Sequence, residues 1–160
     1  MPRIELSTFI AAPPERCFDL ARSIELHVRS TSSTGERAIA GKTTGLLEYG
    51  DVITWRARHF GVWQSLSGRI SAYDRPTHFR DTMLRGAFRH LQHDHFFEPA
   101  TGGTVMRDVF DYSAPLGPLG RVAEWLFLHS YMRRFLEARN RELKAVAESN
   151  AWARYLGPRT

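Results

Sequence analysis

The chain has 160 residues, with 22 basic and 17 acidic side chains and a formal net charge of +5. This length suits one domain with a substantial core, and 42% hydrophobic with 24% charged residues is typical of a globular protein. The basic residues are scattered rather than clustered, so we expect no nucleic-acid partner. The single cysteine, Cys17, excludes an internal disulfide and a thiolate zinc cluster, and it is compatible with the reducing cytoplasm, where we expect the protein.

Several segments that define other protein classes are missing from the sequence. The N-terminus lacks the apolar stretch of a secretory signal. The most apolar helical run, residues 125–128, is far shorter than the roughly 20 residues that cross a bilayer, so we expect no membrane insertion. The sequence also lacks a phosphate-binding loop, a dinucleotide glycine motif, a serine-hydrolase elbow and a Cys-x-x-Cys pair. These absences argue against nucleotide-dependent, serine-hydrolase and thiol-redox enzymes.

The N-terminal part of the chain predicts one strand and two short helices. Apolar and polar side chains alternate over residues 3–10, as in a strand. Pro13 and Pro14 suit the end of this strand and the first turn of a helix. The apolar stripe of this helix consists of Cys17, Phe18, Leu20 and Ala21. A second short helix near residues 24–28 should end at the Ser/Thr/Gly-rich segment 30–35.

From residue 36 to 114 the pattern predicts antiparallel strands separated by glycine-containing turns. One face of the strand 51–60 carries Ile53, Trp55, Ala57 and His59. One face of the strand 62–74 carries Gln64, Leu66, Gly68, Ile70 and Ala72. A tight turn between these strands would bring His59 near Gln64. In segment 77–84 the side chains Phe79, Asp81 and Met83 share a face, with the register left open.

Residues 87–97 and 104–112 form two alternating runs around a Pro/Gly turn, which predicts a β-hairpin. One face of the first strand carries Leu91, His93, His95 and Phe97. The corresponding face of the second carries Met106, Asp108, Phe110 and Tyr112. If the two faces coincide, a few polar groups lie in an apolar wall, which is the composition of a small-molecule pocket.

A pairing of His93 with Asp108 is expected in this hairpin. A register that pairs Phe97 with Thr104 places His93 opposite Asp108 and His95 opposite Met106. The carboxylate would raise the pKa of His93, whereas burial would oppose that shift. Three interpretations stay open: structural pairing inside the sheet, hydrogen bonding to a ligand, and general acid/base catalysis with Asp108 orienting His93.

The C-terminal part predicts one long helix. Residues 121 to about 148 contain no proline or glycine, and a helix of about 28 residues is about 42 Å long, enough to cross a sheet. Its apolar stripe consists of Val122, Trp125, Leu128, Met132, Phe135, Leu136, Leu143 and Val146. The tail, residues 149–160, should be peripheral. The predicted fold class is α+β, with a curved antiparallel sheet wrapped around a long C-terminal helix and two short helices after the first strand.

This order of elements resembles the START-like, or SRPBCC, superfamily with its helix-grip fold. Residues 55–61, 93–99 and 111–120 resemble a bacterial branch labelled polyketide cyclase/dehydrase-like, or cell-division-inhibitor-like when joined to an epimerase domain. The resemblance implies a single ligand-binding domain over residues 1–148, followed by the tail 149–160. A homodimer and an epimerase-like protein partner stay open.

The resemblance further implies a cavity between sheet and helix for a hydrophobic or amphipathic small molecule. The strand and helix patterns supply its expected wall: Trp55, Ala57, His59, Gln64, Leu66, Leu91, His93, His95, Phe97, Met106, Asp108, Phe110, Tyr112, Met132 and Phe135. The apolar members of this set equally suit a filled core. His59, His93, His95 and Asp108 would form a plausible zinc or iron set, but the resemblance argues against metal, and we expect no metal or cofactor.

Three functions follow from these patterns. The favoured one is a non-catalytic protein that binds or transports a hydrophobic small molecule. The second is a cyclase or dehydratase that uses His93 as general base with Asp108 as its orienting partner. The third is a protein-interaction domain with a filled core that works through a dimer or the basic side of the long helix. The arginines of that side are Arg121, Arg133, Arg134, Arg139 and Arg141.

Overall fold

The computed structural model describes residues 2–157. Its strands are β1 (Arg3–Ile10), β2 (Arg37–Gly41), β3 (Val52–His59), β4 (Val62–Asp74), β5 (His78–Arg85), β6 (His90–Ala100) and β7 (Gly103–Ser113). Its helices are α1 (Pro14–Ala21), α2 (Ile24–Ser30), η1 (Ser32–Thr34), α3 (Gly117–Ala123), the π-helical turn η2 (Glu124–Leu128), α4 (His129–Ala147), η3 (Asn150–Trp152) and α5 (Ala153–Leu156). The predicted strand, two short helices, meander and long helix are all present in this order.

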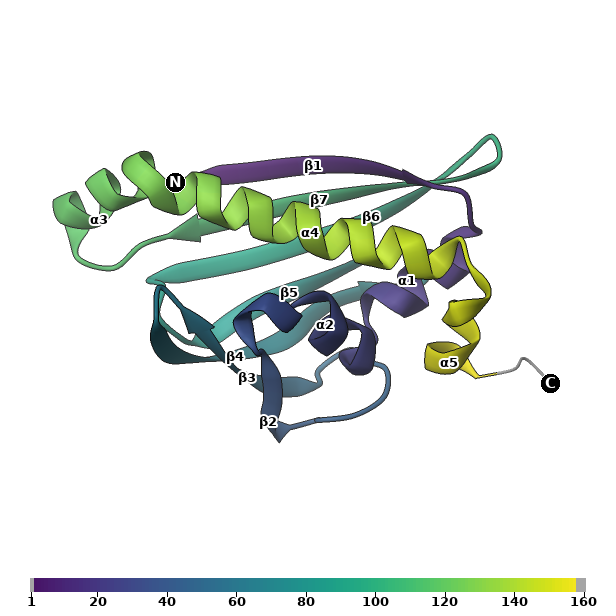
Figure 1. Cartoon of the computed structure of the whole chain (residues 1–160), viewed down its shortest axis with the longest axis horizontal. Helices are drawn as coiled ribbons and strands as arrows, with labels where there is room; N and C mark the ends of the chain where they lie inside the picture. Colours follow the sequence, from purple (N-terminus) through teal and green to yellow (C-terminus); the bar gives the residue numbers. More distant parts are fainter. Residues whose placement is uncertain (1, 158–160) are drawn as a thin grey trace.

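The seven strands form one antiparallel sheet in the order β1-β7-β6-β5-β4-β3-β2. Helix α4 runs along one face of this sheet, with α1 and α2 beside it (Figure 1). It packs against β1, α1 and α2. This arrangement is the helix-grip fold that the sequence predicted.

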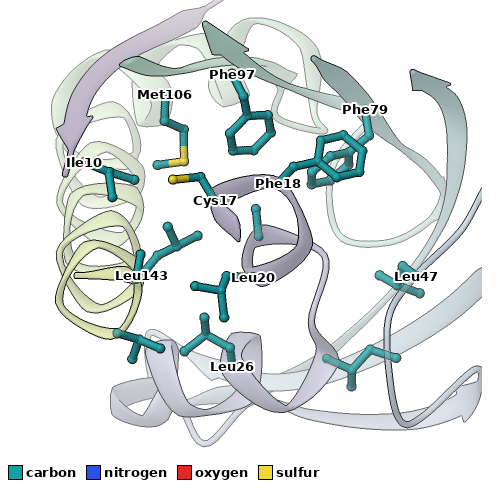
Figure 2. Close-up of a cluster of buried hydrophobic side chains, with 14 of the residues drawn as sticks. Ile10, Cys17, Phe18, Leu20, Leu26, Leu47, Phe79, Phe97, Met106 and Leu143 are labelled. Atoms are coloured by element: carbon teal, nitrogen blue, oxygen red, sulfur yellow. The ribbon is translucent and has the colours of Figure 1, made fainter. Parts of the chain in front are cut away.

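Helix α1 closes one end of the space between sheet and α4. Its predicted apolar stripe is buried, and Phe18 lies edge-to-face against Tyr73, Phe79 and Phe97 at centroid distances of 5.3, 5.3 and 5.4 Å. Figure 2 shows this cluster, in which the sulfur atoms of Cys17 and Met106 point toward each other. A second buried cluster contains Ile4, Leu6, Leu91, Phe110, Tyr112, Met132 and Leu136. The core is therefore divided into two clusters.

The predicted register of the β6–β7 hairpin is wrong. Thr104 pairs with Pro99 instead of Phe97, because the turn is a tight two-residue loop at residues 101–102 rather than a wider one. Gly103, at the start of β7, is required by close packing, since a Cβ there would lie 2.1 Å from the Ile10 carbonyl oxygen. The shift is by an even number of residues, so every side chain keeps its predicted face. His95 therefore lies opposite Asp108.

That register also moves the partner of His93. His93 lies opposite Phe110 on β7, and Met106 lies opposite Phe97 rather than His95. The predicted contact between His93 and Asp108 survives as a diagonal hydrogen bond of 3.0 Å. Long polar side chains on one face reach diagonal neighbours as well as direct ones, which is why the contact tolerates the register change.

The long helix differs from its prediction at its N-terminal end. It starts at Gly117 and runs through η2 to Ala147, 31 residues in total. Val122 and Trp125, predicted to face the core, are 54% and 83% exposed, because α3 extends past the end of the sheet (Figure 1). The exposed apolar side chains of this end are Leu116, Leu119, Val122, Trp125, Leu126 and Phe127.

The predicted peripheral tail is partly folded. In the segment that forms η3 and α5, the Arg16 guanidinium lies over the ring of Trp152 at 4.4 Å, and the Tyr155 hydroxyl accepts a hydrogen bond from Arg29. Residues 158–160 lie outside the described residues. Within the described part of the chain, no helix combines the length and the hydropathy needed to span a membrane.

Candidate functional site

A cavity of about 350 Å³ lies between the sheet and the long helix. Nine residues of the predicted wall line it: Trp55, His59, Gln64, Leu66, Leu91, His93, Phe110, Met132 and Phe135. Six others do not: Ala57, His95, Phe97, Met106, Asp108 and Tyr112. Phe97 and Met106 pack against α1 in the core cluster instead. His95 and Asp108 are buried behind the cavity wall, with 1% and 0% of their surface exposed.

Sequence patterns missed several polar residues of the wall, chiefly His27, Glu36, Asp81, Tyr131 and Arg139. Strand alternation grouped Asp81 with Phe79 and Met83 on one face, but it left the register of the strand open and assigned no function to Asp81. Arg139 was predicted to belong to the basic outer side of the helix, and this is wrong because it is only 6% exposed. The sequence did contain a signal for its burial, because Arg139 follows Leu136 of the apolar stripe by three residues and therefore lies on the same side of the helix.

A polar cluster centred on Asp108 lies behind one wall of the cavity. The carboxylate interacts through Oδ1 with His93 Nε2 at 3.0 Å and His95 Nδ1 at 2.9 Å. Its Oδ2 accepts a 2.6 Å hydrogen bond from Asn140 Nδ2. The other ring nitrogen of His95 lies 3.1 Å from Asp81 Oδ2. His95 therefore bridges a buried carboxylate and one at the cavity wall.

Burial and hydrogen bonding together set the charge states of Asp108 and His95 in this cluster. Burial disfavours a negative Asp108, but hydrogen bonds from His93 and His95 hold its pKa well below the ordinary value. Burial likewise disfavours a positive His95, but hydrogen bonds to Asp108 and Asp81 raise its pKa. An imidazolium at His95 satisfies both carboxylates, because it donates from both ring nitrogens.

His93 behaves differently, because burial, which the sequence analysis named as opposing the effect of Asp108, is the larger of the two effects. Burial, together with the charge of His95, outweighs the bond to Asp108 and lowers the pKa of His93 from 6.5 to about 4. The reason is that one carboxylate cannot compensate two imidazolium charges in a site from which water is excluded. His93 is therefore neutral at pH 7.

This lowered pKa predicts a pH-dependent stability. A histidine that is neutral in the folded state but protonates near pH 6.5 when unfolded stabilises the fold above pH 6.5, and this contribution decreases as the pH falls toward 4. From about pH 6.5 to about pH 4.5 the loss from His93 should be about 2 kcal/mol. Urea unfolding across this range should show it, and His93→Gln should flatten the pH profile. The lowered pKa of His59 acts in the same direction in both proteins. An unchanged slope in His93→Gln would contradict the assignment.

A second polar group lies on the other side of the cavity. His59 Nδ1 and the Tyr131 hydroxyl are 2.7 Å apart, and His27 Nε2 lies 3.1 Å from Glu36 Oε2. The ring of Phe60 packs against that of Tyr131 at 4.5 Å. Burial lowers the pKa of His59. The bond between His59 and Tyr131 joins β3 to the long helix at the cavity wall.

The structure does not bring His59 together with His93, His95 and Asp108, the set that the sequence offered as possible metal ligands. His59 is bonded to Tyr131, and the group with ligand atoms within 4.8 Å of one another is Asp81, His93 and His95. The ring centres of these two histidines are 3.8 Å apart. Two imidazoles on one tetrahedral zinc, with Zn–N bonds of about 2 Å, would have centres about 5 Å apart. In the present rotamers, these rings do not converge on one ion.

Comparison with known proteins agrees with this fold. The family model described as polyketide cyclase/dehydrase and lipid transport matches residues 1–148. A solved structure of TTHA0849 from Thermus thermophilus is similar, with a TM-score of 0.73, 19% identity, and 90% of this chain and 95% of that chain covered. No curated protein matches the chain in sequence.

Two further solved structures are similar. CV1439 from Chromobacterium violaceum has a TM-score of 0.70 and 15% identity, with 92% of this chain and 98% of that chain covered. Ginseng major latex-like protein 151 from Panax ginseng has a TM-score of 0.66 and 16% identity, with the same shares of the two chains covered. At these identities the likeness shows the fold alone. With the family match over residues 1–148, the chain belongs to the polyketide cyclase/dehydrase and lipid transport family of the START-like superfamily.

Proposed function

We propose that this protein binds a hydrophobic or amphipathic small molecule in the cavity and carries or sequesters it in the cytoplasm. The observation that carries the proposal is the cavity of about 350 Å³, within the size range of small-molecule sites. Its wall is largely apolar, with contributions from both core clusters, such as Ile53 and Phe110. The few polar groups in it would orient the ligand.

The cavity also affects the two alternative hypotheses, the interaction domain and the cyclase or dehydratase. A filled core, which the interaction-domain hypothesis predicted, is contradicted by the cavity. One observation supports the cyclase or dehydratase hypothesis: His93 lines the cavity and is oriented by its hydrogen bond with Asp108. A pKa of about 4 makes His93 a weak base at neutral pH. The balance therefore favours binding over catalysis.

Native mass spectrometry of the freshly purified protein is the first test of the proposal. A mass in excess of the polypeptide that disappears on denaturation would identify a bound ligand, and the released molecule can then be identified. Turnover of that molecule by the wild type, abolished in His93→Gln, would replace the binding proposal with the enzymatic one. Binding without turnover supports the binding proposal.

Blocking the cavity should abolish binding. Met83 lines the cavity, whereas the next residue, Leu84, is 52% exposed and does not line it. We expect Met83→Trp to weaken binding of the fluorescent probe 1-anilinonaphthalene-8-sulfonate at least about tenfold, because the indole occupies ligand space. Leu84→Trp is the matched control and should bind the probe like the wild type. Equal affinity in all three proteins, each with a normal melting transition, would place the probe elsewhere and contradict the proposal.

A further inference from the structure

Asp81 is a charged group in the cavity wall with unused hydrogen-bonding capacity. It lies on β5 directly across from His93, it lines the cavity, and its side chain is 34% accessible. Oδ2 is taken by His95 Nε2 at 3.1 Å. Among the described residues no hydrogen bond reaches Oδ1. One carboxylate oxygen therefore remains available to a molecule in the cavity.

The carboxyl group of Asp81 is held in its ionised form by the cluster behind it. Burial would raise its pKa, but the hydrogen bond and charge of His95 lower it below the ordinary value. An ionised carboxylate only accepts hydrogen bonds. An acceptor left without a donor in an apolar site is costly. The cavity ligand is therefore expected to present a donor to Oδ1.

The charge balance of the cluster selects the kind of donor. Asp81 and Asp108 contribute two negative charges. The His95 imidazolium and Arg139, whose Nη1 lies 3.8 Å from Asp108 Oδ1, contribute two positive charges. A cationic amine would add an uncompensated charge to this balanced set, whereas a hydroxyl adds a donor and no charge.

Resting on the binding function proposed above, we propose that the ligand is an apolar molecule with a hydroxyl group, a phenol or an alcohol, which donates a hydrogen bond to Asp81 Oδ1. The apolar body would lie against Leu66, Met83 and Phe110, which line the same cavity. The hydrogen bonds that link Asp81 to His95 and His95 to Asp108 keep the Asp81 carboxylate charged and fix its orientation. A bond to a charged acceptor contributes more than a neutral one, and this gives the site its selectivity.

A matched pair of probes, 2-naphthol and naphthalene, tests this inference by titration calorimetry or fluorescence. The wild type should bind 2-naphthol about 10- to 100-fold more tightly, as expected for a hydrogen bond to a charged group. Asp81→Leu removes the acceptor and should bring the affinity ratio close to one. Asp81→Asn keeps a neutral acceptor and should give an intermediate ratio. Asp94→Asn is the control, because Asp94 pairs with Arg80 and His78 rather than lining the cavity, and it should keep the wild-type ratio.

The outcomes separate the two proposals. Equal affinity of the wild type for both probes, or a ratio that survives Asp81→Leu, overturns the hydroxyl inference and leaves the binding function standing. Failure of both probes to bind the wild type contradicts the binding function and the inference with it. If Asp81→Leu does not fold, the ratio in Asp81→Asn decides, since an unchanged ratio there excludes a bond to a charged carboxylate.

Discussion

Asp108→Ala is expected to lower the free energy of unfolding by about 3–5 kcal/mol, the cost of removing one partner from a buried ionic network. The carboxylate is fully buried and is the shared partner of His93, His95 and Asn140. Without it the imidazolium of His95 and the nearby Arg139 share a single carboxylate, Asp81, and one positive charge is left uncompensated. Urea unfolding at pH 7 should show the loss directly.

The matched control is Asp111→Ala on the same strand. Asp111 accepts hydrogen bonds from Arg3, and the side chains of Arg3 and Asp111 are 57% and 13% exposed. An ion pair with one exposed partner contributes much less than a fully buried network, so the expected loss is clearly smaller than that of Asp108→Ala. Similar losses in the two variants would contradict the central position given to Asp108.

Phe18→Ala should also destabilise the fold by about 3–5 kcal/mol, the usual cost of truncating a buried phenylalanine. Phe18 is 0% exposed, and its ring lies against those of Tyr73, Phe79 and Phe97. Figure 2 shows Phe79 and Phe97 beside it. Removing it leaves a cavity that the surrounding strands cannot fill without moving. The measurement is urea unfolding, with Phe9→Ala as control.

Phe9 is 46% exposed on β1, so its truncation should cost about 1 kcal/mol or less. A small effect of Phe18→Ala would mean that α1 does not depend on this cluster for its position. In that case the closed end of the cavity would be less rigid than its packing indicates, and binding of the fluorescent probe to Phe18→Ala should also change.

The sequence alone determined which elements form and which side chains share a face of a strand. Alternation with a period of two and apolar spacing with a period of about 3.6 are local properties of the chain. They predicted β1, α1, α2, the meander and the long helix, and that Phe79, Asp81 and Met83 share one face of β5. They also predicted that His93 and Asp108 share a face, which is true in both registers because the registers differ by an even number of residues.

Only the tertiary structure decided how those faces are divided between core and cavity. Phe97 and Met106 are covered by α1, while His93 and Phe110 on the same face line the cavity. Strand alternation assigns a face but does not show what packs on it. Helical spacing likewise does not show where the sheet ends, so Trp125 was expected to be buried and is exposed. The same applies to the pKa of His93, because burial and the charge of His95 depend on contacts between strands that local patterns do not encode.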